Sequence, residues 1–194
     1  MRRLHLLLLP LLVLLPGVVN ALPEAHASML INAPIDKVWH SWTTAEGLKS
    51  FLAPDNNIDV RVGGRFDIYF APEREPGQRG TENMRLLILE PNNRLVFTFD
   101  QPTFFPEVRG QHTWVTVTLR VRNENQTDVY ITHAGLGDHG QWIGVHTYFT
   151  NAWQIILGRL EWTMHNGPVD WKNPPSGLWY APDIEELLKL KKSI

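Results

Sequence analysis

The sequence predicts an α+β fold, in which a curved, seven-stranded antiparallel sheet wraps around one long helix near the C-terminus. Between residues 138 and 165, bulky apolar residues recur at steps of three, four and seven, which is the spacing of one face of an α-helix. Upstream, short segments alternate apolar and polar residues, as half-buried strands do. The connections between most of them are short, which favours antiparallel pairing.

Residues 1–21 have the composition of a cleaved signal peptide. Arg2 and Arg3 precede an apolar run over residues 4–19, and Val19-Asn20-Ala21 fits a cleavage site. We therefore expect cleavage after Ala21 and an exported protein, periplasmic or extracellular, with no stable membrane span once the signal is removed. Cleavage after Ala27 is the alternative site, but it would remove most of the first strand. An uncleaved anchor is the other alternative, and the two prolines in a short apolar run argue against it.

Composition excludes several functional classes. The formal net charge of −2 and the isoelectric point near 6.4 provide no basic surface for nucleic acid. The chain has no cysteine, which excludes disulfides, thiolate metal ligands and a cysteine nucleophile. No motif indicates a cofactor, and we expect none.

The first strand is expected over residues 24–32, where Ala25, Ala27, Met29 and Ile31 alternate with other residues. Pro34 then stands at the favoured first position of a short helix. Residues 43–46 resemble a capping box that begins a second short helix, which runs through Phe51. Two short helices are therefore expected between the first two strands.

Six further strands are expected before the long helix. Gly63-Gly64 is typical of a two-residue hairpin, and residues 91–93 have the composition of a turn. The expected strands are Ile58–Val62, Arg65–Phe70, Thr81–Glu90, Arg94–Asp100, His112–Arg122 and Thr127–His133.

The long helix is expected to begin after Asp138, a plausible N-cap, and to end at Gly167-Pro168. The main domain then covers residues 22–166. Residues 167–194 form a Pro/Trp-rich C-terminal extension with a short helix expected over residues 182–192.

Five stretches in order resemble one known family. They are INAPIDKVWHSWT, VGGRFDIYF, LEPNNRLVFTF, ITHAGL and WIGVHTYFTNAWQIILGRLE. Between residues 24 and 165 the chain resembles the helix-grip fold of the START-like (SRPBCC) superfamily, and within it the family named for the C-terminal domain of the activator of Hsp90 ATPase (AHSA1-like). This resemblance implies a cavity between sheet and helix in which a hydrophobic ligand is bound or transformed. It does not imply Hsp90 activation for an exported chain.

Aromatic and apolar residues on the expected inner faces are the candidate lining of such a cavity. The alternative for each of them is a purely structural place in the core. The candidates from the helix are Trp142, His146, Phe149, Trp153 and Ile156, and those from the strands are Phe66, Ile68, Phe97, Phe99, Trp114 and His133. The same alternation predicts that Asp67 and Tyr69 lie on the exterior.

No metal site is expected. His139 and His146 share a helical face, but seven residues of helix separate them by about 10 Å, too far for one ion. HExxH is absent, as is a Gly-x-Ser-x-Gly nucleophile motif.

The leading functional hypothesis is therefore a non-catalytic protein that binds a hydrophobic or aromatic small molecule or a lipid. The first alternative is an enzyme of the cyclase, dehydratase or hydrolase type, with His133 or His146 as general base. The second is a protein-binding module that uses the aromatic segment 171–180 of the extension. The sequence does not specify an oligomeric state.

Overall fold

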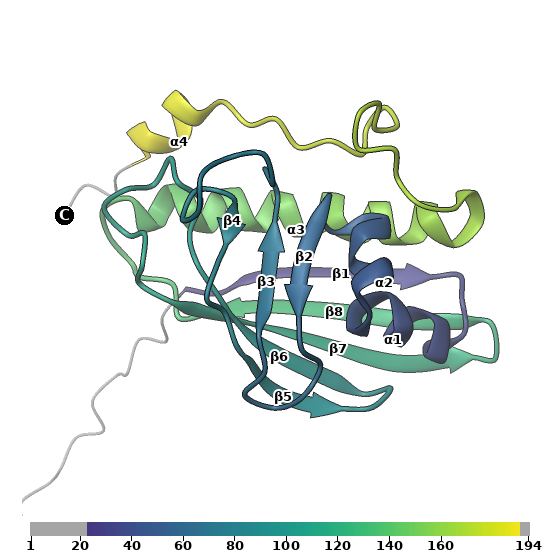
Figure 1. Cartoon of the computed structure of the whole chain (residues 1–194). Coiled ribbons are helices and arrows are strands. Elements are labelled where there is room, and N and C mark those ends of the chain that lie inside the picture. The colour runs from purple at the N-terminus through teal and green to yellow at the C-terminus, as the bar shows by residue number, and fades with distance from the viewer. Residues whose placement is uncertain (1–22, 191–194) are drawn as a thin grey trace, which may run out of the picture.

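The computed structural model describes residues 23–190, in which two antiparallel sheets and four helices surround one core (Figure 1). The expected signal peptide lies outside the described residues. The elements in chain order are β1 (Ala25–Ile31), α1 (Ile35–Thr43), α2 (Ala45–Phe51), β2 (Asp55–Ile58), β3 (Phe66–Tyr69), β4 (Gly80–Thr81), β5 (Leu86–Glu90), β6 (Arg94–Phe99), β7 (Thr113–Asn123), β8 (Gln126–Ala134), α3 (Trp142–Asn166) and α4 (Ile184–Lys189).

The larger sheet has five strands in the order β1-β8-β7-β6-β5, and every neighbouring pair is antiparallel. Alternate residues of β7 are buried, as expected of a strand with one face toward a core. His133 pairs with Ala25 on one side and Val115 on the other, so it lies inside the sheet. The α+β class and the long C-terminal helix are confirmed.

The expected seven-stranded sheet is wrong in its strand count. The strand expected over residues 81–90 is divided at Asn83, whose φ of 65° interrupts extended backbone. Its first part, β4, joins a second sheet in the order β2-β3-β4, whereas its second part, β5, is the edge of the larger sheet. An isolated bridge between Arg65 and Arg85 connects the two sheets.

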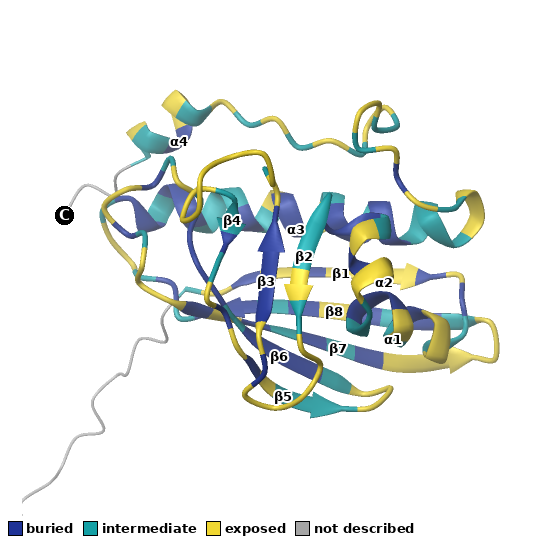
Figure 2. Cartoon of the chain, viewed as in Figure 1, coloured by how far each residue is buried: buried dark blue, intermediate teal, exposed yellow. Residues whose placement is uncertain are grey.

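The expected Gly63-Gly64 hairpin is also wrong. Ile58 pairs with Phe66, so residues 59–65 form one longer connection between β2 and β3. Asp67 is only 1% exposed, although strand alternation predicted an exterior position. Every residue of β3 is buried (Figure 2), because its second face is covered as well. Asp67 is satisfied there by the Arg65 guanidinium at 3.1 Å and by the backbone N–H of Met84 at 2.9 Å.

The two short helices lie between β1 and β2 as expected. The Thr44 hydroxyl accepts a hydrogen bond from the N–H of Gly47 at 3.0 Å, so Thr44 is the N-cap of α2. Trp42 of α1 and Phe51 of α2 meet edge to face, with ring centroids 4.9 Å apart, and both are fully buried. This pair attaches the helices to the core.

The long helix α3 begins at Trp142 and not directly after Asp138. The Asp138 carboxylate contacts the His139 imidazole at 2.8 Å, and the side-chain oxygen of Gln141 accepts from the N–H of Glu107 at 3.0 Å. These contacts hold residues 138–141 in turns before the helix. Its C-terminus is at Gly167, as expected, where φ is 83°.

Residues 167–190 pack back along α3 (Figure 1). The N–H of Val169 donates to the carbonyl of Ser50 at 2.8 Å, and the Trp171 indole N–H donates to the carbonyl of Lys49 at 2.7 Å. At the other end, α4 lies against Gly144 of α3, where an added Cβ would stand 2.4 Å from the carbonyl oxygen of Leu187. None of the helices between residues 23 and 190 combines the length and the apolar content that a membrane span requires.

Candidate ligand cavity

A partly open cavity of about 370 Å³ lies among four segments of the chain. Residues 70–81, from the end of β3 to β4, form one wall, and residues 99–109 after β6 form the next. One face of α3 and residues 171–180 of the C-terminal extension complete the enclosure. The walls are contributed by segments far apart in sequence, so the cavity depends on the tertiary fold.

Aromatic rings form the apolar part of the lining. Phe99, at the end of β6, meets the rings of Phe149 and Trp153 edge to face at 5.5 and 5.6 Å between centroids. Phe149 and Trp153 are four residues apart on α3, and Ala152 and Ile156 extend the same face along the cavity. Rings held at these distances and angles contribute to packing and also present flat surfaces to a ligand.

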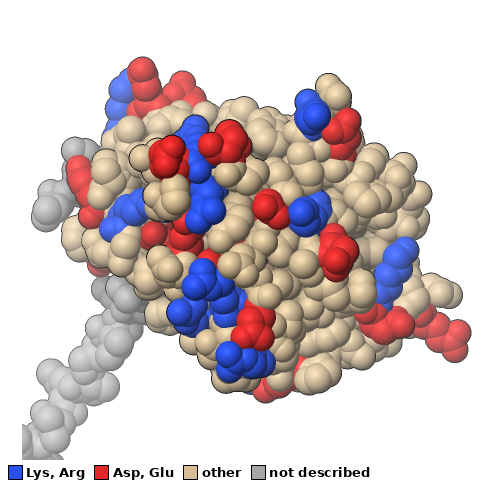
Figure 3. All heavy atoms as spheres, viewed as in Figure 1, with Lys and Arg blue, Asp and Glu red and all other residues tan. Residues whose placement is uncertain are grey.

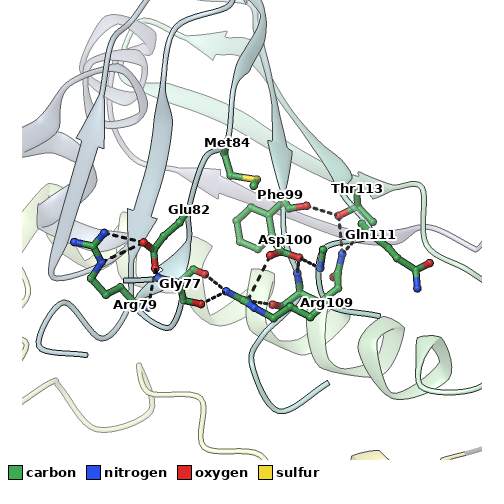
Figure 4. Close-up of polar contacts among 12 residues, drawn as sticks. Gly77, Arg79, Glu82, Met84, Phe99, Asp100, Arg109, Gln111 and Thr113 are labelled. Atoms are coloured by element: carbon green, nitrogen blue, oxygen red, sulfur yellow. Dashed lines mark hydrogen bonds and ion pairs between the residues drawn. The ribbon is translucent and has the colours of Figure 1, made fainter. Parts of the chain in front are cut away.

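The Arg109 guanidinium holds the two loops at the cavity rim together (Figure 4). One terminal nitrogen donates to the carbonyls of Gly77 and Gly80 at 2.9 and 3.0 Å, and the other donates to the carbonyl of Gln101. The Asp100 carboxylate lies 3.7 Å from Arg109 and accepts from the N–H of Gly110 at 2.7 Å. Both loops are thereby fixed to one partly buried ion pair.

A second ion pair closes the loop before β4. The Glu82 carboxylate accepts from the Arg79 guanidinium at 2.7 Å and from the backbone N–H groups of Gly77 and Arg79 (Figure 4). Burial opposes ionisation, but these donors outweigh it and hold the pKa of Glu82 below its usual value. The Arg79 guanidinium also lies 4.4 Å from the centre of the Tyr69 ring. Arg79 lines the cavity, but its guanidinium is paired with Glu82 and lies over the Tyr69 ring.

Arg159 differs from the other arginines of the cavity. The residue is only 7% exposed, and its Nε–H has no hydrogen-bond partner among residues 23–190. Burial lowers the pKa of Arg159 to about 10, so the side chain stays protonated at neutral pH. The Trp171 ring lies 5.2 Å from its guanidinium carbon. A buried cation therefore faces the cavity.

His133 lies behind the cavity wall, and both of its ring nitrogens take part in a series of hydrogen bonds. The Trp153 indole N–H donates to His133 Nδ1 at 3.2 Å, and His133 Nε2 contacts the Thr113 hydroxyl at 2.7 Å. Because Nδ1 accepts, Nε2 carries the proton and donates to Thr113, which in turn donates to the carbonyl of Phe99 at 3.2 Å. Complete burial lowers the pKa of His133 to about 3. The imidazole is neutral, and both of its nitrogens are occupied.

The structure brings four of the residues expected from the sequence together around the cavity. They are Phe99, Phe149, Trp153 and Ile156. Three of the other strand candidates, Phe66, Ile68 and Phe97, are fully buried in the core, where Phe66 packs on Phe97 at 4.5 Å between centroids. They support the cavity from behind and do not line it.

Three other candidates also lie away from the cavity. Trp114 is 45% exposed, because β7 directs its side chain to the outer face, where its ring covers Gly135. Trp142 is buried beside Gly137, and His146 Nε2 lies 3.0 Å from the carbonyl oxygen of Glu24. These contacts account for their positions without a ligand.

Sequence reasoning missed Arg159, the two rim loops and the wall formed by the extension. Arg159 could have been found, because it follows Ala152 by seven residues and Ile156 by three, on the face of α3 that had been identified as apolar. The loops carry no periodic signal, and their place at the rim depends on contacts such as those of Arg109.

A long helix packed on an antiparallel sheet, with a partly apolar cavity beside it, defines the helix-grip class of α+β proteins, a fold that suggests a ligand-binding domain. The sequence profile of the family described as "Activator of Hsp90 ATPase homolog 1-like protein" matches residues 32–165. The chain therefore belongs to this family, as its sequence motifs predicted. Comparison with curated proteins gave no match.

Several solved structures share the fold. Protein MLL2253 from Mesorhizobium loti superposes with a TM-score of 0.59 at 20% identity, over 73% of this chain and 96% of that one. The Aha1 dimer from Colwellia psychrerythraea gives a TM-score of 0.58 at 22% identity, over 75% and 98%. CalU16 from Micromonospora echinospora gives 0.56 at 17% identity, over 85% and 81%. At these identities the similarity establishes the fold alone.

Proposed function

We propose that the protein binds an apolar or aromatic small molecule, or a lipid of similar size, in the cavity beside α3, without transforming it. The observation that carries this proposal is the cavity itself, whose volume of about 370 Å³ lies within the range of small-molecule sites. Its lining by Phe99, Phe149 and Trp153 suits an aromatic or alicyclic body.

The positions of the two candidate bases support binding over catalysis. A general base needs a free lone pair within reach of the substrate. The lone pair of His133 Nδ1 is already used by Trp153, and His133 does not line the cavity. His146 contacts the Glu24 carbonyl and is likewise absent from the lining. A cyclase, dehydratase or hydrolase mechanism based on either histidine therefore lacks support in the geometry.

We also propose that the extension serves the cavity and not a protein partner. Trp171 is held by the Lys49 carbonyl, and the Tyr180 ring packs on Tyr148 of α3 at 5.3 Å between centroids. Trp179 is 55% exposed, but it stands at the cavity as part of the lining. Most of the aromatic surface of the extension is thus directed to its own domain.

Export remains part of the proposal, with residues 1–21 as the signal peptide, residues 22–166 as the main domain and residues 167–194 as its extension. The support is the basic and apolar composition of the N-terminus. Intact-mass measurement of the protein recovered from the periplasm or medium would give a mature chain that begins at Leu22. A full-length chain retained inside the cell would contradict this.

The binding proposal is tested with the neutral fluorescent dye N-phenyl-1-naphthylamine and a variant that fills the cavity. Ala152 lines the cavity, so Ala152→Trp should weaken dye binding by about tenfold or more, since a bulky ring occupies the space. Gln154→Trp is the matched control, because Gln154 is exposed on the same helix and does not line this cavity. Unfolding midpoints verify that both variants fold. Equal dye affinity in wild type and Ala152→Trp, or no binding of either this dye or its sulfonated analogue to wild type, would overturn the proposal.

A further inference from the structure

Arg159 is the one cavity arginine whose buried charge has no acidic counterpart. Arg79 pairs with Glu82 and Arg109 pairs with Asp100. Arg74 also lines the cavity but is exposed to solvent, whereas Arg159 is buried and forms no ion pair within residues 23–190. A buried charge is costly unless it is paired or hydrogen-bonded, so proteins rarely retain such a group without compensation. The Trp171 ring at 5.2 Å provides part of that compensation. The ring does not accept a hydrogen bond from the Nε–H of Arg159, which stays without a partner among the described residues.

Two more unpaired polar atoms lie in residues of the same cavity. They are the side-chain oxygen of Gln101 and the hydroxyl oxygen of Thr81, both buried and without partners among the described residues. The Gln101 amide nitrogen donates to the carbonyl of Gln111 at 3.1 Å and to the Thr113 hydroxyl at 3.2 Å. The Gln111 carbonyl can only accept a hydrogen bond, so the side-chain nitrogen of Gln101, and not its oxygen, must point toward it. The side-chain oxygen of Gln101 is therefore left as an acceptor without a donor.

These three atoms have complementary requirements. The Arg159 Nε–H needs an acceptor, which an anion satisfies best because charge-assisted hydrogen bonds are about twice as strong as neutral ones. The Gln101 oxygen needs a donor, and the Thr81 hydroxyl can serve as either. The apolar part of the cavity is provided by the rings of Phe149 and Trp153. A ligand that is apolar at one end and anionic at the other would satisfy both parts.

The face of the molecule seen in Figure 3 has no extended basic patch that would attract anions. Acidic and basic side chains are interspersed over the face seen in Figure 3, and large areas of that face are uncharged. The formal net charge of the chain is −2, which does not attract anions in general. Anion recognition would therefore come from the buried group in the cavity and not from a surface field.

Building on the proposed binding function, we propose that the cavity selects amphipathic oxyanions, in which a carboxylate or sulfonate pairs with Arg159 and an aromatic or alicyclic body packs on Phe149 and Trp153. Arg159 is then the residue that determines specificity for the charged group.

Two dyes that differ by one anionic group provide the test. Anilinonaphthalene sulfonate carries a sulfonate, and N-phenyl-1-naphthylamine has the same ring system without it. Wild-type protein should bind the sulfonate dye about tenfold more tightly than the neutral dye, the preference expected from one charge-assisted contact in a buried site. Arg159→Met should abolish that preference and change the affinity for the neutral dye by less than about threefold, because only the anion contact is removed. Arg159→Lys should retain part of the preference.

Lys172→Met is the matched control for a nearby exposed cation, since Lys172 is exposed in the extension and does not line the cavity. It should retain the preference for the sulfonate dye. Unfolding midpoints establish that each variant folds, and Arg159→Lys provides the comparison if Arg159→Met does not. Equal affinity of wild type for both dyes, or an unchanged preference in Arg159→Met, would overturn this inference and leave the binding proposal intact. Failure of both dyes to bind wild type would overturn both.

Discussion

The Trp153 indole N–H donates to Nδ1 of His133 across 3.2 Å, and both side chains are almost completely buried. This contact joins α3 to the middle of the larger sheet, because His133 lies on β8 between Ala25 and Val115. Trp153 also forms part of the cavity wall, so this hydrogen bond helps to fix the wall to the sheet, together with the ring contacts of Phe149. His133 is therefore a positioning residue for the cavity.

The buried imidazole predicts a pH dependence of stability. The pKa of His133 is lowered to about 3 by burial, whereas in the unfolded chain a histidine has its ordinary pKa near 6.5. Below pH 6.5 the unfolded state takes up a proton that the folded state does not, so stability falls as the pH falls from 6.5 toward 3. The free energy of unfolding should decrease by about 2 kcal/mol from this group between pH 7 and pH 5.

Guanidinium unfolding of wild type and His133→Gln at the two pH values measures this effect. The variant carries no imidazole at position 133, so its stability should decrease less than that of wild type by about 2 kcal/mol over the same interval. His112→Gln is the control, because His112 is exposed at the end of the neighbouring loop. An identical pH dependence in wild type and His133→Gln would contradict the prediction.

Arg109 provides a second prediction, which concerns the rim. Arg109→Met removes charged donors from the carbonyls of Gly77, Gly80 and Gln101 and leaves Asp100 without its ion pair. Stability should decrease by about 2–4 kcal/mol, the range for losing charge-assisted hydrogen bonds at a partly buried site. Limited proteolysis should cut the 71–80 loop faster, since its main attachment is lost.

The control for the rim is Arg74→Met, in which an exposed arginine of the same loop is changed. Its stability should remain within about 0.5 kcal/mol of wild type, as for most surface substitutions. Equal proteolysis of the loop in the two variants would show that Arg109 does not hold the rim.

The parts of the fold that the sequence predicted are those with local periodicity. Apolar spacing over α3 identified Phe149, Trp153 and Ile156, and short turn signals identified antiparallel neighbours. The division of one expected strand at Asn83 was missed, because a positive φ at a single asparagine leaves no pattern in the neighbouring residues. Two-sided burial of β3 was missed for a related reason, since alternation assumes one solvated face.

The site was less predictable than the fold. Two of its walls are loops and an extension, whose positions depend on single long-range contacts such as the one between Trp171 and Lys49. Arg159 was on a recognised helical face, but an arginine there is usually interpreted as a solvated edge of the apolar stripe. Its burial follows from the extension that covers it, and the sequence does not specify that packing.

A third prediction concerns the contact between Trp171 and Arg159, at 5.2 Å from guanidinium carbon to ring centre. Trp171→Leu should lower stability more in wild type than in Arg159→Met, and a double-mutant cycle should give a coupling of about 0.5–1 kcal/mol, the usual value for a cation over an indole. Urea unfolding of the four proteins measures it. Additive effects of the two substitutions would mean that the ring does not stabilise the buried charge.

The last prediction compares the two glycines in α3 that the extension approaches. At Gly144 an added Cβ would lie 2.4 Å from the Leu187 carbonyl oxygen of α4, a contact that forces a shift, whereas at Gly158 it would lie 3.4 Å from Leu178 Cδ2, which is ordinary packing. Alanine gains about 1 kcal/mol over glycine from helix propensity at either position. Gly158→Ala should therefore be neutral or more stable. Gly144→Ala should displace α4, which limited proteolysis of residues 181–190 would detect as faster cleavage. Equal protection in both variants would mean that α4 is not seated on Gly144.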